Sequence, residues 1–457
     1  MEIVRYANIQ YLSILGEAPV YSNKTYRLSK CLLMVNAYGG KVILNGLTRA
    51  IVFLTNEEFE ELGDINKYTF LYKTYFLVPE DFDELGAVDD IRKRLILPVD
   101  SLYLEYCSSY TILTTYGCNA RCSYCYENSV KSKANMSQET ALKVADYINN
   151  KSGNDIIDLH WFGGEPLFNM KAIDTITGYL RDCGRNFSSS MTSNGYLFDE
   201  KLVTKAVHSW NLENIQITLD GTENVYNKTK NYIYKNTNAF KRVIDNIDLL
   251  LKAGVRVMIR LNIGEHNKED LYELVNQLYD IYGTSQPLEI YCWPLFLTED
   301  VRRPKEDEQL IYAWIEKIEN RLIECGFPFG KLINERIQTH QCMADSGHSI
   351  LISPSGKLGT CEHFVDSNFW GDIYDPTKKD YKVLESWRRY ESRIPECEQC
   401  PIYAECVRPS ECLEMKRCNE LIRDHKIKQY EEGLLDYYLE YRRRSANNSI
   451  LNVNECT

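Results

Sequence analysis

The sequence lacks an excess of positive charge. Its 457 residues carry 53 Lys and Arg against 65 Asp and Glu, which gives a formal net charge of -12. A protein that binds nucleic acid needs a basic face, so this balance argues against that class. A basic peptide remains a possible partner. The length suggests two to four domains.

Long apolar runs and a secretory signal are also missing. No uninterrupted apolar run approaches the roughly 20 residues that cross a membrane. Residues 1–8 show no basic segment followed by an apolar one, the pattern of a signal peptide. We therefore expect a cytoplasmic protein that has no membrane partner.

Cysteine, by contrast, is abundant, with sixteen residues. In a reducing compartment, clustered cysteines more often bind metals or do redox chemistry than form disulfides. Ten of them fall into three groups, within 118–125, 342–361 and 397–418. The six scattered ones are expected to be small buried hydrophobic residues. They are Cys31, Cys107, Cys183, Cys292, Cys325 and Cys456.

The first group has the spacing C-x3-C-x2-C and follows an apolar, β-prone run at 110–115. It consists of Cys118, Cys122 and Cys125. Three thiolates this close can bind three irons of a cubane cluster, while the fourth iron keeps an open position. Chemistry needs an open position, whereas a closed four-Cys site is usually structural. Half of a structural zinc site is the alternative, but no fourth ligand lies nearby.

Residues 111–295 alternate between strand and helix patterns. The expected strands are 111–115, 156–162, 188–193, 214–219, 256–263 and 288–293. The expected helices are 138–150, 170–182, 199–210, 238–252 and 268–282. Six such repeats predict an α/β fold, a partial (β/α)6 TIM-type barrel with outer helices. Its active site should lie at the C-terminal ends of the strands.

The ends of these strands turn polar, often with glycine. The first strand leads into the three-cysteine loop, and the next four end in candidate site residues. These are Gly163, Gly164, Glu165, Pro166, Ser193, Asn194, Thr218, Asp220, Arg260 and Asn262. One polar strand end is unremarkable, but five beside a metal motif indicate one shared site.

Residues 1–105 carry no metal motif. Two strands at 32–37 and 41–45 form an expected hairpin, and 50–55 is a third strand or the start of a helix. Thr55 is expected to cap a helix at 56–62, with another helix at 64–74. This order favours a winged-helix-like module, a type that can bind a peptide as an added strand. The alternative is a cap that only covers the next domain.

The rest of the chain completes the expected domain order. Residues 306–325 predict a connecting helix and 424–444 a charged helix, followed by a polar tail at 445–457. The expected domains are 1–105 for peptide recognition, 106–300 for the barrel, 301–340 for a linker helix, 341–423 for a cysteine-rich domain and 424–457 for the last helix and tail.

These motifs resemble those of a known family. The loop from Cys118 to Cys125 resembles the C-x3-C-x-aromatic-C loop of radical S-adenosylmethionine (SAM) enzymes, and 163–166 resembles their GGEP segment. The C-terminal cysteines resemble a SPASM domain, the auxiliary-cluster module of enzymes that modify peptides and proteins. The resemblance covers roughly 110–296 and 340–420.

The resemblance implies a [4Fe-4S] cluster on Cys118, Cys122 and Cys125 that binds SAM and yields a 5′-deoxyadenosyl radical. It implies that Tyr124 faces the adenine and that Glu165 accepts from the SAM ammonium group, while Gly163 and Gly164 allow a close approach to the ligand. Ser193 and Asn194 resemble ribose or carboxylate contacts. Weaker candidates, for which a salt-bridged or solvated role is the alternative, are Thr218, Asp220, Arg260 and Asn262.

The resemblance also implies two auxiliary [4Fe-4S] clusters. Cluster II would use Cys397, Cys400, Cys406 and Cys418, and cluster I would use Cys342, Cys361 and Cys412. The family pattern expects a cysteine where Ser410 stands, so we assume a two-residue insertion before Cys412. Cluster I is then one ligand short, which leaves Cys292 or Cys325 as a distant ligand, or an open iron for a substrate thiolate. The alternative for these cysteines is structural zinc.

Glu362 follows Cys361 and is a candidate base at the mouth of cluster I, with a solvated acid as the alternative. The histidines at 340, 348 and 363 are expected to be non-ligands.

The implied function is maturation of a ribosomally made precursor peptide (a RiPP). The N-terminal module would bind the leader, an external flavodoxin or ferredoxin would supply electrons, and the product would be a thioether between a Cys sulfur and a carbon. Carbon–carbon or carbon–oxygen cross-linking is one alternative, and oxidation of a protein Cys or Ser, as in anaerobic sulfatase maturation, is another. A non-catalytic iron–sulfur or zinc sensor or scaffold is the alternative outside enzymes.

Overall fold

The computed structural model describes most of the chain. The described residues are 1–16, 25–64, 66–96, 107–129, 134–153, 156–235, 237–284, 287–295, 304–328, 332–364, 367–388, 394–409, 411–412 and 418–454. Ser410 and Cys456 lie outside them. The chain divides into two compact units. The first consists of Met1–Leu97, Phe329–Gln341 and Tyr390–Thr457, and the second of Pro98–Pro328 and Cys342–Arg389.

The second unit is built on a sheet that has nine strands in the described residues, in the order β12-β11-β10-β9-β8-β7-β13-β14-β15. Strands β7 to β12 are parallel and run in chain order. They are Ser109–Leu113, Ile157–Phe162, Phe187–Ser193, Leu212–Thr218, Arg256–Ile263 and Leu288–Pro294. The predicted α/β fold and its largely parallel sheet are confirmed.

Three short strands extend this sheet beyond the expected six. They are β13 (Ser349–Ile352), β14 (Lys357–Gly359) and β15 (Gly371–Asp372). Strand β13 pairs in parallel with β7, and β14 returns antiparallel beside β13. The turn between them contains Gly356 at φ 81°, a conformation that favours glycine. Residues 342–389 of the expected 341–423 domain therefore belong to the barrel unit.

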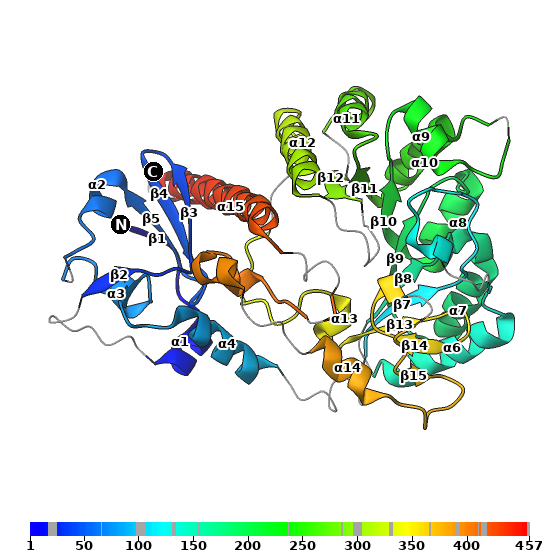
Figure 1. Cartoon of the computed structure of the whole chain (residues 1–457), viewed down its shortest axis with the longest axis horizontal. Helices are drawn as coiled ribbons and strands as arrows, with labels where there is room; N and C mark the ends of the chain where they lie inside the picture. Colours follow the sequence, from blue (N-terminus) through cyan, green and yellow to red (C-terminus); the bar gives the residue numbers. More distant parts are fainter. Residues whose placement is uncertain are drawn as a thin grey trace. The chain divides into compact units, whose positions relative to one another are not determined.

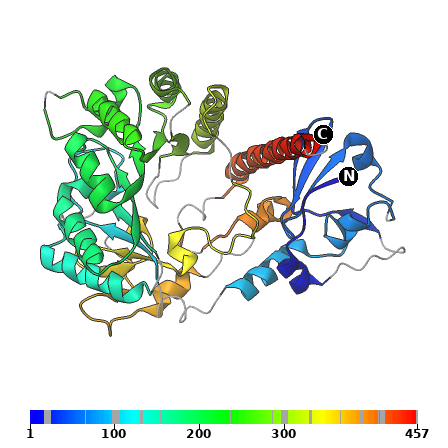
Figure 2. The same ribbon diagram turned by 180° about the vertical axis from the view of Figure 1, so that it is seen from behind.

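Helices cover one face of the parallel strands (Figures 1 and 2). They are α6 (Gln138–Lys151), α7 (Met170–Asp182), α8 (Glu200–Trp210), α10 (Ala239–Lys252) and α11 (Lys268–Tyr282), close to the predicted ranges. The additional α9 (Glu223–Lys230) was not predicted. The expected connecting helix is α12 (Lys305–Glu324).

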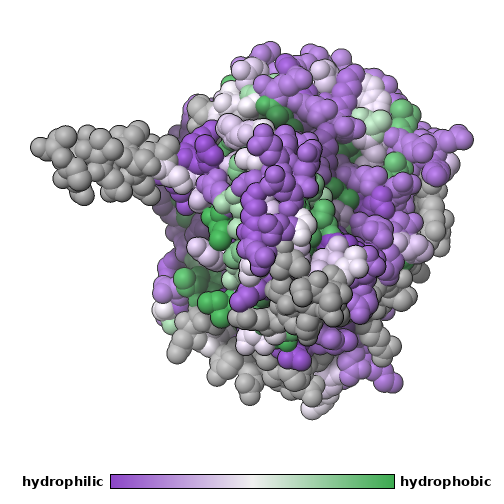
Figure 3. Space-filling model, turned by 90° about the vertical axis from the view of Figure 1, so that its left-hand side faces the viewer, coloured by the Kyte–Doolittle hydropathy of each residue, from purple (hydrophilic) through white to green (hydrophobic). Residues whose placement is uncertain are grey.

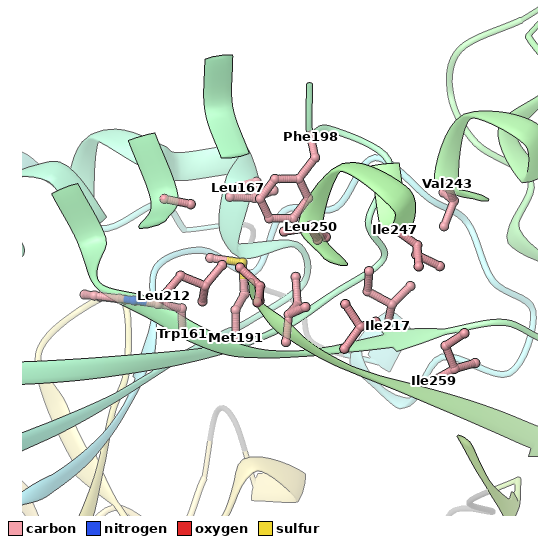
Figure 4. Packing of buried hydrophobic residues seen from close by; sticks show 14 of the residues in the cluster. Trp161, Leu167, Met191, Phe198, Leu212, Ile217, Val243, Ile247, Leu250 and Ile259 are labelled. Carbon is pink, nitrogen blue, oxygen red and sulfur yellow. The ribbon is translucent and has the colours of Figure 1, made fainter. Parts of the chain in front are cut away.

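The sheet has one apolar and one polar face. Along β8 and β9 every second side chain is buried, including Trp161 and Met191. These point toward Ile247 and Leu250 of α10 and form the core of the unit (Figure 4). The alternate side chains face away from the helices. Burying one face therefore leaves the other free to form a site.

The first unit contains an antiparallel sheet of order β1-β5-β4-β3 among its described residues. These strands are Glu2–Arg5, Ile51–Thr55, Gly40–Asn45 and Leu32–Ala37, and a smaller sheet pairs β2 (Tyr26–Leu28) with β6 (Leu77–Pro79). Its helices include α1 (Ile9–Leu15), α2 (Asn56–Glu60), α3 (Thr69–Lys73) and α4 (Glu84–Leu95). Residues 51–55 are thus a strand, which settles the alternative left open by the sequence.

Helices α2 and α3 follow the first sheet in the chain. Thr55 and Glu58 form a capping box at the start of α2, as predicted. The helix predicted at 64–74 was too long, because the Asp64 carboxylate accepts from the backbone N–H groups of Asn66 and Lys67. Those bonds form a turn, and helix α3 begins only at Thr69.

The last helix is longer than predicted. Helix α15 spans Glu420–Asn454, so it continues beyond the predicted 424–444 into the segment expected to be a polar tail. This segment contains no Gly or Pro to end the helix. Tyr438 of α15 stacks on Phe53 of β5, with ring centroids 5.4 Å apart, so the helix packs on the sheet.

On the face shown in Figure 3, hydrophilic residues form the protruding ridges, and hydrophobic residues show mainly in the hollows between them. Among the described residues, none of the helices combines the length and the apolar content needed to cross a bilayer.

Candidate active site

A cavity of about 550 Å³ lies at the polar face and the C-terminal strand ends of the second unit. Its wall includes all three cysteines of the first group, Cys118, Cys122 and Cys125. The strands and the residues that directly follow them line the same cavity. These lining residues include His160, Gly163, Gly164, Ser190, Thr192, Ser193, Asn194, Asn214, Gln216, Thr218, Met258, Arg260, Asn262 and Glu289. The predicted gathering of strand-end residues around the cysteine loop is thus present for most of them.

The cysteine loop is fastened by hydrogen bonds from several elements. The N–H of Gly117 donates to Thr115 Oγ1 (2.8 Å), and its carbonyl accepts from the N–H of Glu165 (2.9 Å). Asn119 Oδ1 accepts from Asn194 Nδ2 at 2.7 Å. The end of β7, the GGEP segment and the end of β9 therefore hold one loop.

The three thiols suit a cubane cluster better than a single ion. In the described residues no three His, Cys, Asp or Glu side chains converge as the ligands of one metal ion. Each thiolate of a cubane binds a different iron, so its ligands need not converge on a point. Burial raises the pKa of Cys118 to about 12 and that of Cys125 to about 11. The negative charge of Glu165 adds to the rise at Cys118, that of Glu127 adds to the rise at Cys125, and the Cys122 thiol adds to both. A cationic cluster would stabilise the thiolates that these pKa values disfavour.

The two glycines of the GGEP segment allow a close approach of the chain to itself. Gly163 has φ 129°, and a Cβ atom there would lie 2.3 Å from the carbonyl oxygen of Thr115. A Cβ atom on Gly164 would lie 2.5 Å from the carbonyl oxygen of Gly117. Both glycines line the cavity. Glycine is required at these positions because a Cβ atom would collide with the backbone that leads into the cysteine loop. Pro166 begins the short 3-10 helix η2 (Pro166–Asn169).

Glu165 is fully buried beside the cavity. Its Oε1 accepts from the Ser193 hydroxyl (2.9 Å) and the Leu167 N–H (3.1 Å), and its Oε2 accepts from the Asn194 N–H (2.8 Å). Burial raises its pKa to about 7, although these bonds oppose the rise. The carboxylate thus joins the ends of β8 and β9 and organises two other predicted site residues.

Tyr124 of the cysteine loop forms a polar group with the buried side chains of Asp220 and Lys230. Tyr124 donates to Asp220, and Lys230 Nζ lies 2.8 Å from Asp220 Oδ2 and 2.9 Å from Tyr124 Oη. Asn262 donates to Asp220 Oδ1 (3.3 Å) and accepts from Arg260 Nε (2.8 Å). Lys230 was not predicted as a site residue. The amphipathic pattern at 223–230 could have predicted its helix, α9.

Polar side chains of strands β8, β9, β10 and β12 form hydrogen bonds with one another on the polar face of the sheet. The ring nitrogens of His160 lie 2.8 Å from Ser190 Oγ and 3.1 Å from Thr192 Oγ1. Burial lowers the pKa of His160, which favours the neutral ring. On β12, the Tyr291 hydroxyl donates to Gln216 Oε1 (2.7 Å). The wall therefore offers several hydrogen-bonding side chains to a bound molecule.

The second cysteine region reaches the same cavity. Glu362 and His363, directly after Cys361, belong to its wall together with Tyr126 and Glu127 of the first loop. The Tyr126 and His363 rings lie 5.1 Å apart. Cys361 itself is buried, and Cys342 is exposed at the start of α13 (Met343–Ser346). The two suggested distant ligands, Cys292 and Cys325, are buried in the apolar core.

The cysteines of the third group, within 397–418, lie in the first unit, where Cys397 and Cys400 pack against residues of the N-terminal module. Cys397 and Cys400 are buried, while Cys406, Cys412 and Cys418 are partly exposed. Burial raises the pKa of Cys400 to about 12, and Cys406, Cys397 and Cys418 add to it, which indicates that these thiols lie near one another.

Two arginines of the N-terminal module hold the loop at 397–406. Buried Arg49 pairs with Glu405, and Arg92 Nη2 donates to the carbonyls of Tyr403 (2.8 Å) and Cys406 (3.0 Å).

Comparison with protein families agrees with this site. Residues 112–278 match the radical SAM superfamily. This range contains the three-cysteine loop, the GGEP segment and strands β8 to β11. It forms a radical SAM domain.

Three curated relatives are similar to this chain. MJ0907 of Methanocaldococcus jannaschii is 25% identical over 271 residues, covering 58% of this chain and 88% of the relative. The radical SAM cyclopropyl synthase TigE of Paramaledivibacter caminithermalis is 21% identical, covering 52% and 58%. The sporulation killing factor maturation protein SkfB of Bacillus subtilis is 25% identical, covering 37% and 39%. The chain thus spans less than two thirds of TigE and SkfB.

A solved structure shares the fold. "Native anSMEcpe with bound AdoMet" superposes with a TM-score of 0.54 at 15% identity, covering 74% of this chain and 99% of that one. This likeness agrees with the partial barrel seen here.

Proposed function

We propose that this radical SAM enzyme matures a ribosomally made peptide by forming a thioether between a Cys sulfur and a carbon of the substrate. One observation carries the proposal. Glu362 and His363, next to Cys361, share a cavity wall with Cys118, Cys122 and Cys125. A peptide in this cavity therefore lies beside both cysteine regions.

The proposed roles around the first loop follow from its contacts. Cys118, Cys122 and Cys125 hold a [4Fe-4S] cluster, and bound SAM supplies a radical that takes hydrogen from the peptide. Glu165 accepts from the SAM ammonium group and orders Ser193 and Asn194 through the bonds described above. Tyr124 forms the side of the pocket that faces the adenine. Secondary contacts come from Gly163, Gly164, Pro166, Thr218, Asp220, Arg260 and Asn262.

The remaining cysteines are proposed as ligands of two auxiliary clusters. Cys397, Cys400, Cys406 and Cys418 hold one [4Fe-4S] cluster, which the mutual influence of these thiols supports. Cys342 and Cys361 of the second unit would be ligands of the other. It would leave one iron open to the substrate thiolate and would accept the electron that is released when the C–S bond forms. Glu362 at the cavity wall is the base that removes the thiol proton.

The N-terminal module is proposed to bind the leader of the precursor. Strand β3 is an end strand of its sheet and pairs only with β4 among the described residues. Met34 and Asn36 of this strand are exposed. An extended peptide can add to such an edge through main-chain hydrogen bonds. A flavodoxin or ferredoxin is the proposed electron donor.

Co-expression with any short open reading frame found beside this gene, followed by mass spectrometry of the peptide, tests this function. The product should lose two hydrogen atoms, and its linked Cys should no longer react with iodoacetamide. The matched control replaces Cys118, Cys122 and Cys125 with Ala and should leave the peptide unchanged. A product that has lost two hydrogens but keeps every Cys reactive would contradict thioether formation.

A further inference from the structure

The backbone of the segment at the end of α9 is hydrogen-bonded to the backbone of the cysteine loop. The carbonyl of Lys230 accepts from the N–H of Arg121 (2.8 Å), and the N–H of Ile233 donates to the carbonyl of Asn119 (2.9 Å). Between them, Asn231 ends the helix in the left-handed conformation, at φ 42°. This turn places Lys230 directly against residues that lie between the cysteines.

The side chain of Lys230 then reaches into the same loop. It is 3% exposed, and its ammonium contacts both Asp220 and Tyr124, as described above. The ammonium also lies 5.6 Å from the centre of the Tyr124 ring. Burial alone would lower the pKa of Lys230, but Asp220 and Tyr124 outweigh it and raise the pKa. The ammonium therefore stays charged and fixes the Tyr124 hydroxyl.

We propose that Lys230 is a positioning residue that holds the Tyr124 ring in the wall of the SAM pocket, where it faces the adenine. This inference rests on the proposed function. A buried charge that loses its partner is strongly unfavourable, so removing the ammonium leaves Asp220 unpaired. Asp220 and Tyr124 then rearrange, and the pocket loses the wall against which the adenosine moiety packs. The methionine moiety binds elsewhere, at the cluster and Glu165, and keeps its contacts.

Equilibrium binding to the anaerobically iron-loaded full chain tests this inference. Lys230→Met should raise the Kd of SAM about tenfold, the effect of losing one buried hydrogen-bonding group. The methionine concentration that perturbs the EPR spectrum of the reduced cluster should stay unchanged. Lys228→Met, which replaces an exposed lysine of the same helix, is the matched control and should bind SAM as the wild type does.

A second variant keeps the inference testable if Lys230→Met does not fold. Asp220→Asn/Lys230→Met removes both charges and leaves none unpaired, so it should load iron fully and still bind SAM weakly. Wild-type SAM affinity in either variant would overturn the inference, as would an equal loss of SAM and methionine binding in the double variant. Wild-type protein that loads iron but binds no SAM would instead contradict the proposed function, and the inference with it.

Discussion

The loop at 118–125 and the loop at 397–406 both present cysteines, but their surroundings differ. The first is fastened by backbone and side-chain hydrogen bonds within its own unit, and its three thiols line a cavity. The second is fastened by buried arginines of the N-terminal module, and Cys397 and Cys400 are buried in a packed core. An accessible thiol set suits a cluster that meets a substrate, whereas an enclosed set suits structure or electron transfer. On this comparison we propose that the first loop is the catalytic one.

Removing the thiols of each loop should separate the two roles most strongly. Replacing Cys118, Cys122 and Cys125 with Ala should remove about four irons, one cubane, and leave the unfolding of the N-terminal module unchanged. Replacing Cys397, Cys400 and Cys406 should remove a similar amount and destabilise that module, because their loop is part of its core. Iron analysis and thermal unfolding measure both effects. If the two triple variants unfold alike, the loops do not differ as described.

The arginine that supports the second loop should have the next largest effect. Arg49→Met leaves the Glu405 carboxylate buried without its partner and should lower the free energy of unfolding by about 3–5 kcal/mol. Urea unfolding measures the change. Lys93→Met, at an exposed cation of the same unit, is the control and should have little effect. A small effect of Arg49→Met would show that the pair does not hold the loop.

The buried carboxylate beside the first loop should make stability depend on pH. The pKa of Glu165 is about 7 in the folded protein against an ordinary 4.5. The folded state therefore binds the proton more tightly, and stability falls by roughly 3 kcal/mol as the pH rises from below 4.5 through about 7. Glu165→Gln should remove this slope when unfolding is followed without SAM. An unchanged slope would place its origin elsewhere.

The smallest expected effect lies far from both loops. Thr55→Ala removes half of the capping box of α2 and should cost about 1 kcal/mol of stability. Iron content and SAM binding should remain at wild-type levels. A loss of iron in this variant would show that the N-terminal module and the second loop are coupled more widely than through Arg49 and Arg92.

The contrast between the loops also shows what the sequence could predict. Strands β8 to β12 alternate in a clear pattern, so their ends and the residues beside the cysteine loop were placed correctly. Local spacing also predicted the capping box at Thr55. These features depend on residues close together in the chain.

Long-range features were not predictable in the same way. The pairing of β13 with β7 joins residues about 240 positions apart in the chain. The ion pair of Arg49 with Glu405 joins residues that are 356 positions apart. Lys230 was missed because its partners, Tyr124 and Asp220, come from two other elements. Such contacts depend on tertiary packing, which no local pattern encodes.

Formation of 5′-deoxyadenosine tests the central assignment most directly. Iron-loaded wild-type protein, reduced anaerobically and given SAM, should produce 5′-deoxyadenosine. The Cys118, Cys122 and Cys125 to Ala variant should produce none while it keeps the iron at its other cysteines. Formation of 5′-deoxyadenosine at the wild-type rate by that variant, or none by the loaded and reduced wild type, would contradict the assignment of catalysis to the first loop.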